Sequence, residues 1–205
     1  MAIKPILFNT EMVRAILDGR KDATRRIVKG FIPDDAVWGY TAFTPKGYIS
    51  CRGTFADGYG EKFFKLPCEP GDILYVRETW MDYAGLTMYK ADCDIYRLDS
   101  LNLAGFGWKP SIHMPKEAAR IWLKVTDVRV ERLHGITGAS IQKEGIEVDP
   151  KEYASKFDFI SELFLLFQRL WDSTIKKSDI DHYGWDANPY VWVISFERCD
   201  KPKGV

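Results

Sequence analysis

The sequence predicts an α+β fold built on a small, strongly curved β-sheet or barrel. Apolar strand signals occur beside helices that do not alternate regularly with them, and one strand signal changes phase partway along. Ile121, Leu123 and Val125 form one alternating set, and Val128 and Val130 resume out of step with it. A strand that changes faces needs a bulge or bend, which suits a curved sheet or barrel better than a flat sandwich.

The length and composition indicate one domain with elaborations. The chain has 205 residues, of which 46% are hydrophobic and 28% are charged, so it can bury a substantial core. Glycine and proline punctuate two stretches densely. We therefore expect a single domain over residues 1–205 with loop-rich insertions at about 31–67 and 83–112, the first leaving room only for short strands and turns.

Four regular elements can be placed before the last strand. A helix is expected over 10–17, where Asn9 or Thr10 can cap the start and Gly19 the end. Residues 73–77 form a β-rich run after a Pro-Gly-Asp turn. A short helix is expected over 136–144, and the longest helix over 158–172, with a wide apolar face that indicates packing.

Residues at both ends of the short helix are of types that favour helix termini. The last expected element is a strand. Thr137 can cap that helix and Gly145 can stop it. Residues 190–196 are apolar on both faces, which predicts a central or covered strand.

The charges exclude a globally basic protein but are unevenly distributed. Twenty-nine Lys plus Arg balance twenty-nine Asp plus Glu. Residues 1–30 nevertheless hold seven bases and three acids, a net +4, and residues 109–132 hold six bases and three acids, a net +3. Residues 141–200 hold seven bases and twelve acids, a net −5. Nucleic-acid binding would therefore have to come from a local patch, and scattered solvated charge is the simpler alternative.

Several classes of protein are disfavoured by what the sequence lacks. No apolar run is long enough for a signal peptide or a membrane span. The four cysteines form no CxxC pair, and the three histidines show no metal-ligand spacing. We expect a cytoplasmic protein with free thiols, with no membrane association, no metal site and no cofactor.

The densest functional signal follows the first helix. Residues 19–26 place four cations around one hydroxyl: Arg20, Lys21, Thr24, Arg25 and Arg26. Arginine forks bind oxyanions bidentately and lysine acts as a point charge, so the cluster suits a phosphate or an anionic transition state. A solvated turn with no function is the alternative.

An ordered set of short motifs resembles the ASCH family. The motifs are Gly19-Arg20-Lys21-x-x-Thr24-x-Arg26, Pro70-Gly71-Asp72-Ile73-Leu74, Lys124-Val125-Thr126, Ile136-Thr137 leading to Glu144-Gly145, and the closing Val193-Ile194-Ser195-Phe196. This resemblance implies a β-barrel related to the PUA fold and an association with RNA or modified nucleosides. Further segments, Ser111 to Pro115 and Gly184 to Pro189, look like the larger phage and prophage members of the family.

One bacterial branch of that family hydrolyses N(4)-acetylcytidine. Its proposed catalytic Lys, Thr and Glu match Lys21, Thr24 and Glu144 here, although Asp22 stands where the family often has a hydroxyl residue. A threonine becomes nucleophilic only beside a base. A neutral Lys21 can be that base, because burial and the neighbouring arginines would depress its pKa, whereas an ionised Glu144 alongside would raise it. If Glu144 is close, either it transfers the proton while Lys21 stays a cation that holds the oxyanion, or Glu144 is protonated in the resting state.

A local geometry is expected for these residues. Lys21 and Thr24 share a face on a helical turn but point to opposite faces of a strand. We therefore expect a turn over residues 20–24.

Other candidates have both a functional and a structural interpretation. Arg20, Arg25 and Arg26 would bind the substrate or nucleic acid. Trp80 can stack on a nucleobase or lie in the core, and His113 can contact a base or phosphate or be structural. The alternatives to a hydrolase are a non-catalytic RNA-binding module, a metal-independent ribonuclease, and a phage accessory protein that binds another protein through an aromatic surface.

Overall fold

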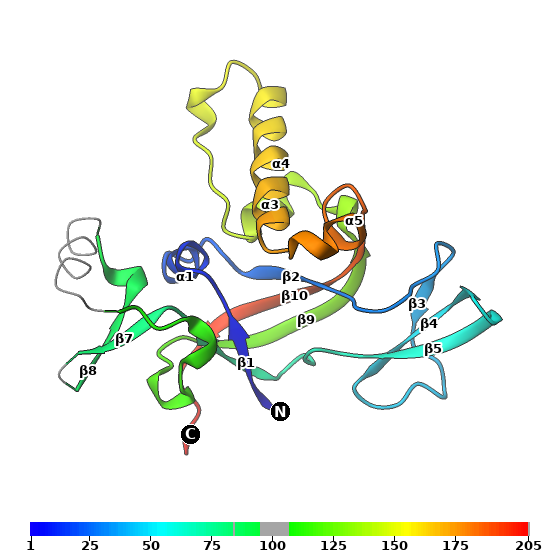
Figure 1. Ribbon diagram of the computed structural model, residues 1–205, viewed down its shortest axis with the longest axis horizontal. Coiled ribbons are helices and arrows are strands. Elements are labelled where there is room, and N and C mark those ends of the chain that lie inside the picture. The colour runs from blue at the N-terminus through cyan, green and yellow to red at the C-terminus, as the bar shows by residue number, and fades with distance from the viewer. Residues whose placement is uncertain (84, 95–106, 205) are drawn as a thin grey trace.

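A five-stranded sheet forms the centre of the molecule in a computed structural model, which describes residues 1–83, 85–94 and 107–204 (Figure 1). The strand order is β1-β6-β9-β10-β2. These strands span Ile3–Leu7, Ile73–Arg77, Trp122–Arg132, Tyr190–Cys199 and Ala23–Ile27, respectively. β1 and β6 run parallel, and the other neighbours are antiparallel.

The α+β class is confirmed, whereas the closed barrel is not. Among the described residues, β1 pairs only with β6 and β2 only with β10, so both remain edge strands of an open sheet. The closing strand β10 lies between β9 and β2. Val191 and Val193 contribute to one core cluster and Trp192 and Ile194 to another, which confirms a central strand that is apolar on both faces.

The predicted phase change is a β-bulge. Ser195 of β10 pairs with Asp127, and the next residue, Phe196, pairs with Val125, so Thr126 is the extra residue on β9. One unpaired residue shifts the side-chain alternation by one position and bends the strand. The long strands β9 and β10 accordingly curve along their length (Figure 1).

The helices lie mostly on one side of the sheet, and each longer helix begins at a side-chain cap. α1 (Thr10–Leu17) begins at Asn9, whose side chain accepts from Met12 N at 2.8 Å. Thr137 caps α3 (Gly138–Lys143) and Ser155 caps α4 (Lys156–Ser173). A short α5 spans Ile180–Tyr183. α3, α4 and α5 stand together over the outer face of β10 and β2 (Figure 1).

The first predicted insertion contains more sheet than expected. β3 (Val37–Gly39), β4 (Tyr48–Phe55) and β5 (Gly58–Lys65) form a separate three-stranded sheet, in which two strands are eight residues long. The expectation of short strands was wrong because the glycines pair inside the hairpin, Gly53 opposite Gly60, instead of ending strands. Only Gly58, with φ 110°, serves the turn.

The second predicted insertion is only partly described. It contains a hairpin of β7 (Trp80–Tyr83) and β8 (Leu86–Tyr89), and residues 95–106 lie outside the described residues. Among the described residues, the other helical elements are single 3-10 turns at Lys90–Asp92, Ser111–His113, Lys116–Ala118, Leu133–Gly135, Pro150–Glu152 and Lys177–Asp179. The hairpin and the three-stranded sheet lie at opposite ends of the molecule (Figure 1).

Gly53 is predicted to be required for the three-stranded sheet to pack. A Cβ at this position would lie 2.7 Å from Pro33 Cγ and 2.9 Å from Asp35 Oδ1, whereas a Cβ on its partner Gly60 would meet nothing within 4 Å. We expect Gly53→Ala to lower the free energy of unfolding by about 1–3 kcal/mol through overpacking. Gly60→Ala is the matched control and should be neutral or slightly stabilising. Urea unfolding followed by tryptophan fluorescence measures both, and equal stabilities would contradict the proposed steric role.

Candidate functional site

The chain reversal after α1 brings Lys21 beside Glu144. Gly19 adopts φ 74°, and the backbone N–H of Lys21 donates to Ala15 O at 3.0 Å. Lys21 then forms an isolated antiparallel bridge with Glu144, and Asp22 N donates to Lys143 O at 3.0 Å. The expected turn over residues 20–24 was therefore wrong. The reversal is complete by Gly19, and the chain is already extended at Lys21 as it enters β2. The shared helical face expected for Lys21 and Thr24 therefore does not form.

Lys21 is an enclosed cation with no donor to spare. Its side chain is 0% exposed. Nζ donates to Glu144 Oε2 at 2.7 Å, to Ala23 O at 2.8 Å and to Glu144 O at 2.9 Å. Three acceptors use all three protons of an ammonium group, whereas a neutral amine carries only two. The arrangement thus favours the interpretation in which Lys21 stays charged and holds Glu144.

Burial opposes that charge. It lowers the pKa of Lys21 below its ordinary value, and Glu144 acts in the opposite direction through its charge and its hydrogen bond. Arg26 and Arg25 lower the pKa of Lys21 further by like-charge repulsion. The ammonium therefore depends on its contact with the Glu144 carboxylate.

Arg25 is the second cation on the same carboxylate. Its Nη1 donates to Glu144 Oε1 at 3.1 Å and its Nη2 to Glu131 Oε2 at 3.5 Å, while its side chain is only 2% exposed. Its Nε is buried and has no hydrogen-bond partner among the described residues. Glu144 is thus fixed from two sides, and each of its oxygens already accepts one charged donor.

Thr24 and Arg26 form a second pair beside this group. Arg26 Nη1 donates to Thr24 Oγ1 at 2.9 Å, and Arg26 Nη2 donates to Leu7 O at 2.9 Å. The second contact spans the two edge strands of the open sheet, β2 and β1. Because the Thr24 oxygen accepts this bond, its own proton is left to donate elsewhere.

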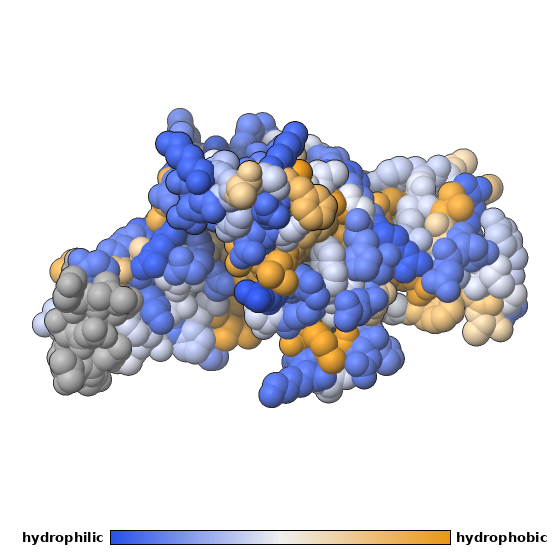
Figure 2. Space-filling view, turned by 90° about the horizontal axis from the view of Figure 1, so that it is seen from above, coloured by the Kyte–Doolittle hydropathy of each residue, from blue (hydrophilic) through white to orange (hydrophobic). Residues whose placement is uncertain are grey.

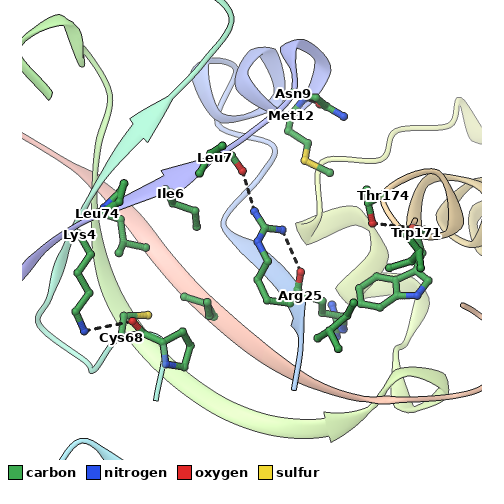
Figure 3. A pocket seen from close by; sticks show the side chains of 16 residues that line it. Lys4, Ile6, Leu7, Asn9, Met12, Arg25, Cys68, Leu74, Trp171 and Thr174 are labelled. Carbon is green, nitrogen blue, oxygen red and sulfur yellow. Dashed lines mark hydrogen bonds between the residues drawn. The ribbon is translucent and has the colours of Figure 1, made fainter. Parts of the chain in front are cut away.

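Two adjoining cavities open onto these groups. A small one of about 30 Å³ is lined by Thr24, Arg25, Arg26 and Glu144 together with residues of α1 and α4. A larger one of about 500 Å³ lies between the edge strands β1 and β2 and the end of α4. Both are lined by Met12, Arg25, Arg26, Trp171 and Thr174. Figure 3 shows Ile6 and Leu7 on one side of the larger hollow and Trp171 and Thr174 on the other.

The larger cavity is suited to a small ligand. Its volume falls in the range of about 300–1,000 Å³ that is typical of small-molecule sites, and apolar side chains predominate in its walls. The sequence pattern did not single out Met12, Trp171 or Thr174 as site residues. Trp171 belongs to the apolar face of α4, and that face predicts packing whether or not part of it borders a cavity.

The predicted site residues do not all converge. Lys21, Thr24, Arg25, Arg26 and Glu144 lie together, although Lys21 itself lines none of the cavities described. Arg20 stands at the margin, where its Nη1 donates to Gly145 O at 2.9 Å.

Trp80 and His113 lie away from this group. Trp80 is 8% exposed and packs in a separate core cluster with Met114 and Trp122, under Lys109 Nζ at 4.6 Å from its ring. His113 is exposed in the turn over 111–113. Of the two alternatives given for Trp80, its place in this apolar cluster favours the core position over stacking on a ligand.

Gly145 allows Glu144 to approach the first helix. It adopts φ 88°, and a Cβ there would lie 2.6 Å from Ala15 Cβ and 3.1 Å from Lys21 Cβ. Only glycine accepts both the left-handed conformation and this contact. The Glu144-Gly145 pair is thus one structural unit: the glycine permits the close approach that the carboxylate uses.

Other parts of the described chain offer no competing reactive centre of the usual kinds. No group of three or more His, Cys, Asp or Glu side chains in this part could hold a metal ion. Burial raises the pKa of Cys51 and of Cys68 to about 11, which disfavours the thiolate. None of the helices described has the length and apolarity to cross a bilayer.

Comparison with known proteins gives one similar solved structure. The crystal structure of an ASCH domain from Lactobacillus crispatus JV V101 is 11% identical to this chain and covers 96% of it, while the match covers 79% of that domain, at a TM-score of 0.38. No protein-family model and no curated protein matches the sequence. A likeness at this TM-score does not establish a shared fold.

Loss of the Glu144 charge is predicted to destabilise the protein strongly. Glu144→Gln would leave Lys21 and Arg25 buried beside a neutral amide, and breaking a buried ion pair from one side costs about 3–5 kcal/mol. Glu131→Gln is the matched control, because Glu131 touches the same arginine but its side chain is 29% exposed. That change should cost no more than about 1 kcal/mol. Urea unfolding compares the variants, and a small, equal loss in both would contradict the central role given to Glu144.

Proposed function

We propose that the protein is an ASCH-type domain that binds an N(4)-acylated cytidine, free or within RNA, and hydrolyses its exocyclic amide. The single observation that supports this most is the Glu144 carboxylate, held by Lys21 at 2.7 Å and Arg25 at 3.1 Å where it lines a small cavity with Thr24. Of these residues, Lys21, Thr24 and Glu144 are the ones that match the hydrolase branch of the family. The larger adjoining cavity would receive the nucleoside.

The proposed nucleophile is the Thr24 hydroxyl. Its oxygen accepts from Arg26 Nη1, which leaves its proton to donate, and the proposed acceptor is Glu144, which lines the same small cavity. A carboxylate offers about four lone-pair positions, so Glu144 retains accepting capacity beside Lys21 and Arg25. Lys21 acts in this scheme as a positioning residue, because all its protons are committed to Glu144 and to backbone oxygens.

The reaction balances with water as the only co-reactant. The Thr24 oxygen bonds to the acyl carbon, its proton moves to Glu144, and the carbonyl π electrons move onto oxygen. When this electron pair re-forms the carbonyl, the bond between the acyl carbon and the cytosine nitrogen breaks. Glu144 gives the proton to the departing cytosine amine. Water then attacks the Thr24 ester, which releases a carboxylic acid and restores the hydroxyl.

The small cavity suits that second step. Its volume of about 30 Å³ is the space of roughly one water molecule. Thr24, Glu144 and two arginines line it, so a water there would have the two to four polar partners that ordered water needs.

Exposed apolar side chains offer less support for a protein-binding function. Those that are more than half exposed are spread over the first residue, loops, the three-stranded sheet, the β8 hairpin and α4: Met1, Phe31, Val37, Tyr40, Phe43, Tyr59, Leu86, Ile112 and Phe157. From the helix side, apolar residues form separate areas among predominantly hydrophilic ones (Figure 2). A cavity beside Glu144 favours a small ligand over the protein partner.

The test is release of cytidine from N(4)-acetylcytidine, measured by chromatography. Thr24→Val removes the hydroxyl and nearly preserves the shape of a side chain that is 1% exposed. We expect kcat to fall at least about 100-fold, since the nucleophile and its proton are lost. Thr126→Val, the same change at the exposed bulge of β9, should leave turnover intact.

One outcome would contradict the proposed nucleophile and another the hydrolase itself. Undiminished turnover in Thr24→Val would remove Thr24 as nucleophile. Binding of the nucleoside with no cytidine release from the wild type would instead favour a non-catalytic binding module.

A further inference from the structure

Arg25 carries a buried hydrogen-bond donor that the protein itself does not use. Its two terminal nitrogens contact Glu144 and Glu131, but Nε has no hydrogen-bond partner among the described residues. Leaving a buried donor unpaired costs about 1–3 kcal/mol, and nearly all such groups in folded proteins have a partner. An unpaired donor on a residue that lines the cavities therefore points to an acceptor supplied from outside the chain.

The neighbouring cations, Lys21 and Arg26, have no buried nitrogen that lacks a hydrogen-bond partner among the described residues. Lys21 uses its three protons on protein oxygens. Both terminal nitrogens of Arg26 are also engaged, one by Thr24 and Arg25 oxygens and the other by Leu7 O. Arg25 is a lining residue of the small cavity, of the large cavity and of a third cavity of about 130 Å³.

We infer that Arg25 Nε–H binds an anionic oxygen derived from the acyl group of the ligand, namely the oxyanion formed during attack on the carbonyl and the carboxylate of the product. The oxyanion role rests on the proposed hydrolysis, whereas carboxylate binding does not. A fixed positive donor stabilises the oxygen more as its charge develops, so the contact would lower the barrier and not merely tighten binding. Arg25 would thereby be a catalytic residue distinct from the Lys, Thr and Glu set.

Acetate is the probe for carboxylate binding. The ¹H–¹⁵N resonances of the arginine Nε–H groups are followed as acetate is added to the wild-type protein, and the Arg25 resonance is the one that Arg25→Lys removes. We expect this resonance to shift saturably. An Arg25 resonance that does not move would overturn the inference, whether or not the protein proves to be a hydrolase.

A control variant tests whether acetate binds in the small and larger cavities beside Glu144 or in the third cavity. Lys143 lines only the cavity of about 130 Å³, which also contains Arg129 and Ser140. Lys143→Gln should leave the acetate-induced shift unchanged. Loss of the shift in this variant would place the anion in the third cavity and contradict the proposed role.

Steady-state kinetics with N(4)-acetylcytidine test whether Arg25 stabilises the oxyanion. Arg25→Lys keeps the positive charge and the reach to Glu144 but removes the planar Nε–H. We expect kcat to fall about 100- to 1,000-fold, as when one oxyanion donor is lost, with KM little changed. Arg129→Lys is the matched control, since Arg129 pairs with Asp127 and Glu131 outside the two catalytic cavities.

The outcomes separate the two proposals. If the Arg25 Nε–H resonance of the wild-type protein shifts with acetate but the protein releases no cytidine from N(4)-acetylcytidine, the proposed hydrolysis is contradicted and the Arg25 anion site is supported. A wild-type protein that hydrolyses the substrate equally well as Arg25→Lys would end the oxyanion role alone.

Discussion

The structure around β2 depends on one buried carboxylate that balances two buried cations. Glu144 is 5% exposed, Lys21 is 3% exposed and Arg25 is 4% exposed. Removing these charges from water costs several kcal/mol per ion, and only close, well-directed contacts offset it. The chain meets this requirement by joining segments that lie more than a hundred residues apart. The end of α1, the start of β2 and the end of α3 all meet at Glu144.

This constraint also orders the groups around the cavities. Because Lys21 and Arg25 hold both Glu144 oxygens, the carboxylate has a fixed direction before any ligand arrives. Preorganised polar groups contribute to catalysis because they need not rearrange when charge develops. The same close packing explains Gly145, whose lack of a side chain lets Glu144 sit beside Ala15 and Lys21. In this interpretation, the ion cluster serves the fold and the proposed chemistry together.

Much of the local structure could be predicted from the sequence because local rules determine it. The 10–17 helix, its Asn9 cap and its Gly19 stop follow from capping and φ preferences, and the phase change in 121–130 indicates the bulge directly. The proximity of Lys21 and Glu144 was expected only from the family resemblance, since periodicity says nothing about residues 123 positions apart.

The errors also have physical causes. Glycines read as strand breakers proved to be paired inside the β4–β5 hairpin. The turn expected over residues 20–24 was replaced by an extended bridge, because the contacts of Lys21 and Asp22 with Ala15 and Lys143 are tertiary. That Arg25 Nε has no partner among the described residues follows from which groups the fold places around it, and a sequence pattern does not contain this information.

The most direct test of the central claim is a crystal structure of Thr24→Val with N(4)-acetylcytidine bound, since that variant would bind the substrate without consuming it. The account predicts the nucleoside in the larger cavity and its acetyl carbonyl turned toward the small one, with the carbonyl oxygen at hydrogen-bond distance from Arg25 Nε and the amide nitrogen facing Glu144. A nucleoside bound elsewhere, or one whose acetyl group points away from Glu144, would contradict it.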